Sequence, residues 1–104
     1  MNFKIDSMKE EDSLSIHLDG DFDMYAAPGI KADLIHRLEA GVRKVIVDMT
    51  EVRYLDSSGV GVIVSLVKTA RRIGANISFI GLGGNPKKLL ERTNLLPLLG
   101  EAIA

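Results

Sequence analysis

The residues best suited to chemistry are an aspartate followed by two serines, Asp56, Ser57 and Ser58. They come shortly after an extended apolar segment at 45–48, and the hydrophobic period becomes helical directly after Ser58. Because Asp and Ser side chains accept hydrogen bonds from the free N–H groups of a first helical turn, a helix is predicted to start here. Such a helix start carries partial positive charge and unpaired donors. We therefore expect a phosphate on one of these serines to be stabilised by its surroundings.

The helix predicted after these serines has two different faces when it is projected at about 100° per residue. One broad apolar arc suits packing on a sheet and a neighbouring helix, and it comprises Gly59, Val60, Ile63, Val64, Leu66, Val67, Ala70 and Ile73. The opposite side is a polar stripe of Ser58, Gly61, Ser65, Lys68 and Arg72. We expect an exposed surface that is smooth near the helix start and basic further along.

Two glycines, Gly59 and Gly61, fall in the first turns of this helix. A glycine inside a helix costs about 1 kcal/mol relative to alanine, so two of them call for a reason. One interpretation is close approach on both sides, with Gly59 against the sheet and Gly61 towards another molecule. The other is that both relieve crowding at a tight strand-to-helix turn.

Size and composition indicate one ordinary domain over residues 1–104. The chain is 46% hydrophobic and 26% charged and has a net charge of −1, which gives no electrostatic argument for binding nucleic acid or an acidic membrane. It contains no cysteine, so disulfides, thiolate metal sites and cysteine nucleophiles are excluded. No signal peptide and no apolar run near the roughly 20 residues of a membrane span is visible. We expect a soluble, cytoplasmic protein.

The other elements follow from period and punctuation. We expect a hairpin of strands at 3–6 and 14–18, closed by Asp19-Gly20-Asp21, and a helix over 27–40 that Gly41 stops. Inner strands are predicted at 45–47 and 76–80. A short helix is predicted from Asn85 and Pro86 to residue 93, with the apolar tail 95–100 packing as a cap.

This order of elements predicts a small α/β fold, with a mixed, mostly parallel sheet of about four strands and helices packed against it. The loops that follow the inner parallel strands gather at one edge of such a sheet. Asp23, Asp56 and Ser57 are therefore expected to meet there.

Residues 54–61, Tyr-Leu-Asp-Ser-Ser-Gly-Val-Gly, resemble the signature of STAS domains, specifically of the bacterial anti-sigma factor antagonists. Residues 20–27 and 87–95 are similar to two further blocks of that family, so the likeness covers nearly the whole chain. The chain departs from the family pattern at Ala26, where Thr or Ser is frequent, and it lacks the further strand and long terminal helix of many members.

The resemblance implies a phosphorylation switch. In such proteins the serine that matches Ser57 is phosphorylated by a partner that is both a serine kinase and an anti-sigma factor. The unmodified antagonist binds this partner and frees a sigma factor; the phosphorylated form releases it, and a serine phosphatase resets the cycle. No cofactor is implied. Partner contacts are then expected at Asp23, Asp56, Ser57, Ser58, Gly59, Gly61, Ser65 and Lys68.

Each of these residues also has a plainer interpretation. Ser57 is explained equally by a helix cap, and Ser58 is the alternative phosphorylation site. Asp56 suits bonding of the turn backbone as well as reception of the kinase, and Asp23 suits an ordinary turn. The stripe of Ser65, Lys68 and Arg72 is typical of a solvated helix face.

Other functions have less support in the sequence. The same fold also suits a fixed subunit of a stress-signalling scaffold or a lipid-transport ATPase that works without a phosphate cycle. The glycine-rich loop 81–87 lacks the spacing of a nucleotide-binding loop. His17 and His36 have no partner at metal-ligand spacing, and no histidine adjoins Ser57 as a base. The sequence therefore favours a regulatory binding protein over an enzyme.

Overall fold

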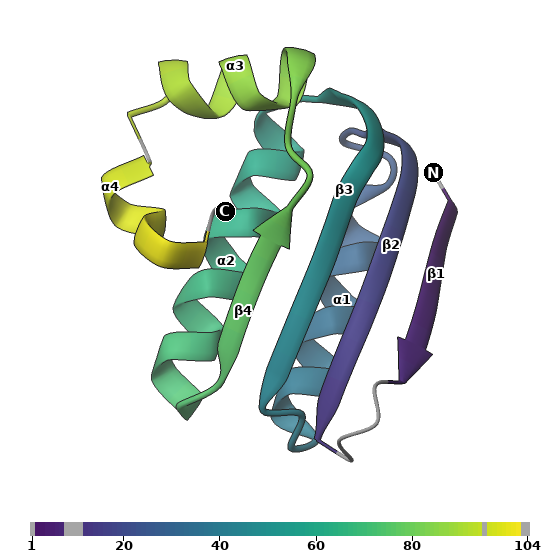
Figure 1. Ribbon diagram of the computed structural model, residues 1–104, viewed down its shortest axis with the longest axis vertical. Coiled ribbons are helices and arrows are strands. Elements are labelled where there is room, and N and C mark those ends of the chain that lie inside the picture. The colour runs from purple at the N-terminus through teal and green to yellow at the C-terminus, as the bar shows by residue number, and fades with distance from the viewer. Residues whose placement is uncertain (1, 8–11, 95, 103–104) are drawn as a thin grey trace.

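A computed structural model describes residues 2–7, 12–94 and 96–102 (Figure 1). The strands are β1 (Asn2–Ser7), β2 (Ser13–Phe22), β3 (Lys44–Leu55) and β4 (Asn76–Ile80). The helices are α1 (Ala27–Glu39), α2 (Ser57–Ile73), α3 (Gly84–Arg92) and α4 (Leu96–Leu99), and a 3-10 turn, η1, covers Gly100–Ala102. Within these residues no helix is both long and apolar enough to cross a bilayer.

The four strands form one sheet in the order β1-β2-β3-β4. β1 pairs with β2 antiparallel, whereas β2 with β3 and β3 with β4 are parallel. The predicted mixed, mostly parallel sheet of an α/β fold is confirmed. In the parallel register Phe22 lies opposite Leu55, so β2 and β3 end side by side.

Helices α1 and α2 lie together behind the sheet in Figure 1, and the core fills the space between them and the strands. Strand residues that alternate along β2 and β3 are buried there, as their period of two requires. The apolar arc predicted for α2 is confirmed where it faces this core. The largest fully buried side chains are Phe22, Phe79, Ile16, Leu18, Leu38, Met49, Leu55, Ile63, Leu66, Leu90, Leu99 and Val45.

Both inner strands next to the site are longer than predicted. Asp19-Gly20-Asp21 does not close β2, which continues to Phe22 through two register shifts, with Gly20 at a φ of 115°. β3 extends through exposed Thr50, Glu51 and Arg53 to buried Leu55. The sequence prediction ended the strand at residue 47 because it relied on a continuous apolar run. The rest of β3 carries polar residues because it is buried on one face only.

The C-terminal third differs from the sequence prediction in its details. Gly83, and not Asn85, is the N-cap of α3. The Asn85 side-chain oxygen instead accepts a hydrogen bond from the Leu55 N–H at 3.3 Å, which ties α3 to the end of β3. The predicted packing of the tail is confirmed by Leu99, which is fully buried, while Leu95 lies outside the described residues.

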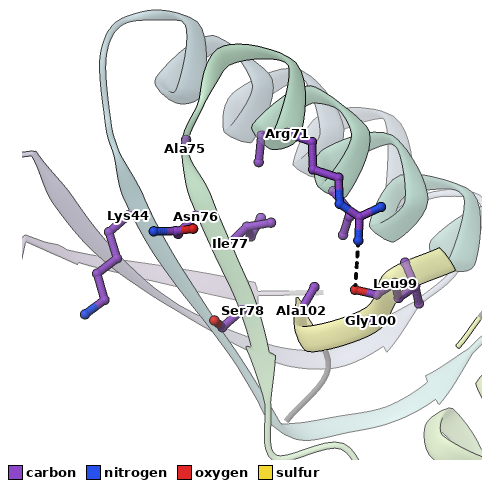
Figure 2. Close-up of a pocket in the computed structure, with 11 residues that line it drawn as sticks. Lys44, Arg71, Ala75, Asn76, Ile77, Ser78, Leu99, Gly100 and Ala102 are labelled. Atoms are coloured by element: carbon purple, nitrogen blue, oxygen red, sulfur yellow. Dashed lines mark hydrogen bonds between the residues drawn. The ribbon is translucent and has the colours of Figure 1, made fainter. Parts of the chain in front are cut away.

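A cavity of about 580 Å³ lies between β4, the second half of α2 and the C-terminal turn (Figure 2). The Arg71 guanidinium crosses one side of it and donates a hydrogen bond to the Leu99 carbonyl at 3.4 Å. This contact fastens the tail to α2.

Candidate functional site

The predicted start of the central helix is confirmed, and its cap is Asp56. Asp56 has an extended backbone, with φ −110° and ψ −175°. Its Oδ1 accepts hydrogen bonds from the backbone N–H groups of Ser58 at 2.9 Å and of Gly59 at 3.1 Å. Ser57 is the first residue of α2 and is exposed, so its interpretation as the helix cap is wrong.

The second carboxylate oxygen of Asp56 reaches the loop between β2 and α1. Asp56 Oδ2 accepts the Met24 N–H at 3.0 Å, and the Asp56 N–H donates to the Phe22 carbonyl at 3.4 Å. A carboxylate has acceptor sites enough for all of these donors. One side chain therefore caps α2 and holds the neighbouring loop against it.

Asp23 organises that loop. Its Oδ1 accepts hydrogen bonds from the N–H groups of Tyr25 at 3.0 Å and Ala26 at 3.1 Å, and its carbonyl accepts from Ala27 at 2.9 Å. Asp23 thus satisfies amides at the entry to α1, where Ala26 has no hydroxyl to act as a cap. The loops of Asp23 and Asp56 come together at the ends of β2 and β3, as predicted.

The electrostatics at Ser57 differ from the sequence expectation. The sequence predicts free N–H groups at the helix start, but the Asp56 carboxylate already accepts hydrogen bonds from those of Ser58 and Gly59. A phosphate on Ser57 would share the helix terminus with a carboxylate on the preceding residue. The site therefore adds repulsion to the attraction of the helix dipole.

The two glycines of the first turns have opposite surroundings. A Cβ on Gly59 would lie 2.5 Å from both Leu55 Cδ1 and the Phe22 carbonyl oxygen. Gly59 is buried at this close approach to the sheet, so its place at the site is structural. Gly61 is exposed, and a Cβ there would meet nothing within 4 Å. The predicted directions of both glycines are confirmed.

Gly61 opens a groove of about 410 Å³ between α1 and α2, and one of its lining residues, Ser58, directly follows Ser57 in the sequence. Ser58 and Ser65 are half-buried along it, whereas Lys68 does not line it and is exposed further down α2, about 16 Å from Ser57 along the helix. The lining residues are Ala27, Pro28, Lys31, Ser58, Gly61, Val62 and Ser65.

The sequence matches the STAS domain family over residues 4–103 of the chain. The protein belongs to the STAS domain family. It is 32% identical over 101 residues to an anti-sigma-B factor antagonist of Listeria monocytogenes, with 95% of this chain and 88% of that protein aligned. The STAS domain also resembles, in fold, two solved structures of SpoIIAA, which is described as an anti-sigma factor antagonist and as a Bacillus cell fate determinant.

Both SpoIIAA structures align with nearly the whole STAS domain. The unphosphorylated form matches with a TM-score of 0.75 and 17% identity, over 99% of this chain and 87% of that one. The phosphorylated form matches with a TM-score of 0.70 and 22% identity, over 99% and 89%.

The STAS domain also exposes three large side chains near Asp56 that the sequence analysis did not assign. Tyr25 is 86% exposed, Met24 60% and Tyr54 47%. Met24 and Tyr25 lie on the loop between β2 and α1, and Tyr54 is the second-last residue of β3. Tyrosine and methionine are enriched in protein interfaces, and this preference is the signal that would have identified them.

Proposed function

We propose that this STAS domain is an anti-sigma factor antagonist that is switched by phosphorylation of Ser57. The observation that carries the proposal is the position of Ser57, which is exposed at the first residue of α2 directly after the Asp56 cap. The curated relatives named anti-sigma-B factor antagonists support it, among them the Listeria protein at 32% identity. The domain acts as a binding module and needs no cofactor.

The proposed partner is an anti-sigma factor with serine kinase activity, and it binds the unmodified domain over the N-terminal end of α2. Exposed Met24 and Tyr25 supply apolar contact area, and Asp56 keeps their loop beside Ser57. The further contact residues are Asp23, Ser58, Gly61, Ser65 and Lys68. Binding frees a sigma factor, so this cycle belongs in the cytoplasm.

The negative charge of the phosphate on Ser57 dissociates the complex with the anti-sigma factor. A phosphate adds about −1.5 to −2 charges at one point of a chain whose net charge is −1. The group would lie beside the Asp56 carboxylate, and a partner that covers it must remove water from both charges. The partner is released, and a serine phosphatase restores the binding form.

The switch requires no change of fold. Solved forms of SpoIIAA, unphosphorylated and phosphorylated, match this chain at TM-scores of 0.75 and 0.70. The match to both forms supports a switch that leaves the fold unchanged. We place the effect of the phosphate at the interface itself.

Ser57 is preferred to Ser58 because Ser58 is half-buried in the groove and its backbone N–H is bound to Asp56. Incubation with ATP and the serine kinase anti-sigma factor of the same genome tests this choice. We expect one phosphate at Ser57 by peptide mass spectrometry, lost in Ser57→Ala and retained in Ser58→Ala. Phosphate on Ser58 alone, or none, would contradict the proposal. Tight binding that Ser57→Asp leaves unchanged would indicate a fixed subunit.

A further inference from the structure

The groove between α1 and α2 has an apolar floor, and its α2 side is low because a glycine lies there. Ala27 and Val62 form the floor and are 5% and 4% exposed. Pro28 and Lys31 of α1 line one side. Gly61 leaves the other side open because it has no side chain, and its Cβ position is empty to 4 Å. A concave apolar surface of this kind suits one inserted apolar side chain.

The α1 side of the groove also carries a lysine. Lys31 is exposed and makes no ion pair with any described residue, since the ion pairs among them are His17–Asp48 and Arg37–Asp33. The floor and the serines of the groove carry no charge. An occupant with a carboxylate beside its apolar side chain would complement this surface.

The groove is continuous with the switch. Ser58, which directly follows Ser57, lines the groove at the start of α2, and Gly61 and Ser65 follow on the same face of the helix. A molecule that covers Ser57 and extends along α2 therefore meets the groove next.

We propose that this groove receives an apolar side chain of the anti-sigma factor, flanked by a carboxylate that pairs with Lys31. The inference rests on the proposed function and extends its contact surface to α1, where Lys31 becomes a specificity-determining residue. The inserted apolar side chain and the carboxylate of the partner then determine which partner binds, whereas Ser57 controls its release.

The test measures the affinity of the same-genome anti-sigma factor kinase for variants of the unphosphorylated domain. Gly61→Leu adds a side chain that occupies the groove from a position where a Cβ meets nothing within 4 Å, and Lys31→Glu reverses the charge. We expect each change to weaken binding about tenfold or more. Gly61→Ala, which fills less of the groove, should weaken binding less than Gly61→Leu.

Two controls match these variants. Gly29→Leu adds the same side chain on α1 at a position that is equally free to 4 Å and does not line the groove. Lys44→Glu makes the same charge reversal at the start of β3, the end of the strand far from Asp56. Both should bind within about twofold of the wild type, since surface changes outside an interface have little effect. Thermal unfolding of all variants verifies that they are folded.

Two results would overturn the inference and leave the proposed function intact. In one, Gly61→Leu and Lys31→Glu bind like the wild type and still lose the partner on Ser57 phosphorylation. In the other, Lys31→Glu leaves binding unchanged but alters release, so that Lys31 serves the phosphate. If the wild-type domain itself fails to bind the kinase, the proposed function and the inference are both wrong.

Discussion

The Met24 backbone N–H and the Asp56 carboxylate are joined by a hydrogen bond of 3.0 Å across 32 residues of sequence. The same carboxylate caps α2 through Ser58 and Gly59. Asp56 thus couples the exposed loop of Met24 and Tyr25 to the helix that begins with Ser57. Under the proposed function, a phosphate on Ser57 would therefore act on a contact surface built from both loops.

Replacing Asp56 by alanine should destabilise the domain by about 2 kcal/mol, because an N-cap and the bond to Met24 are lost together. Asp56→Asn keeps one oxygen for the cap and should lose less. Chemical denaturation measures both free energies of unfolding. Equal stability of Asp56→Ala and the wild type would show that these bonds contribute nothing.

The two glycines of α2 should respond to alanine in opposite directions. Gly59→Ala places a Cβ 2.5 Å from the Phe22 carbonyl, which forces the sheet and helix apart at a cost of about 1–3 kcal/mol. Gly61→Ala adds a methyl group in open space and should stabilise the helix by up to about 1 kcal/mol. Thermal and urea unfolding of the pair decides this, and a destabilised Gly61→Ala would be inconsistent with the open surroundings.

Stability should depend on pH through Asp48 on the face of the sheet away from α1 and α2. Hydrogen bonds from the Thr50 side chain and backbone N–H hold the pKa of Asp48 below its ordinary value of 3.8, against the opposing effect of burial, and His17 adds to the lowering. A lowered pKa in the folded state contributes stability above the unfolded value, and this is lost as pH falls through the folded value.

The variant Thr50→Val removes the strongest of these interactions. Its deficit in unfolding free energy should be largest at neutral pH and shrink as pH falls below about 4. Thr69→Val on α2 serves as the control, with an effect that does not vary over this range. A constant deficit for Thr50→Val would exclude the contribution of Asp48.

Much of this site could be predicted from the sequence because it follows from chain topology. Parallel strands joined by helices bring the loops after Phe22 and Leu55 to one edge, so the meeting of the Asp23 and Asp56 loops was foreseeable. The helical period also gave the directions of Gly59 and Gly61.

The side-chain contacts between loops could not be predicted from the sequence. That Asp56 rather than Ser57 caps α2, and that Asn85 bonds Leu55 rather than capping α3, depends on distances fixed by strand register and helix packing. The α1 side of the groove was missed for the same reason. Lys31 and Gly61 lie 30 positions apart, and only the packed pair of helices brings them to one surface.

The variant Ser57→Asp should keep the wild-type structure, since Ser57 is exposed and the core beneath it is unaffected. Crystal structures or NMR chemical shifts of the two proteins test this, and changes are expected only around Asp56 and the Met24 loop. A rearranged α2 would contradict a switch that acts at the interface.

The most direct test is a calorimetric titration of the anti-sigma factor with the unmodified domain and with the domain phosphorylated at Ser57. We predict binding of the unmodified form and an affinity at least about tenfold lower for the phosphorylated form. Equal affinities for the two forms would contradict the central claim that Ser57 controls release.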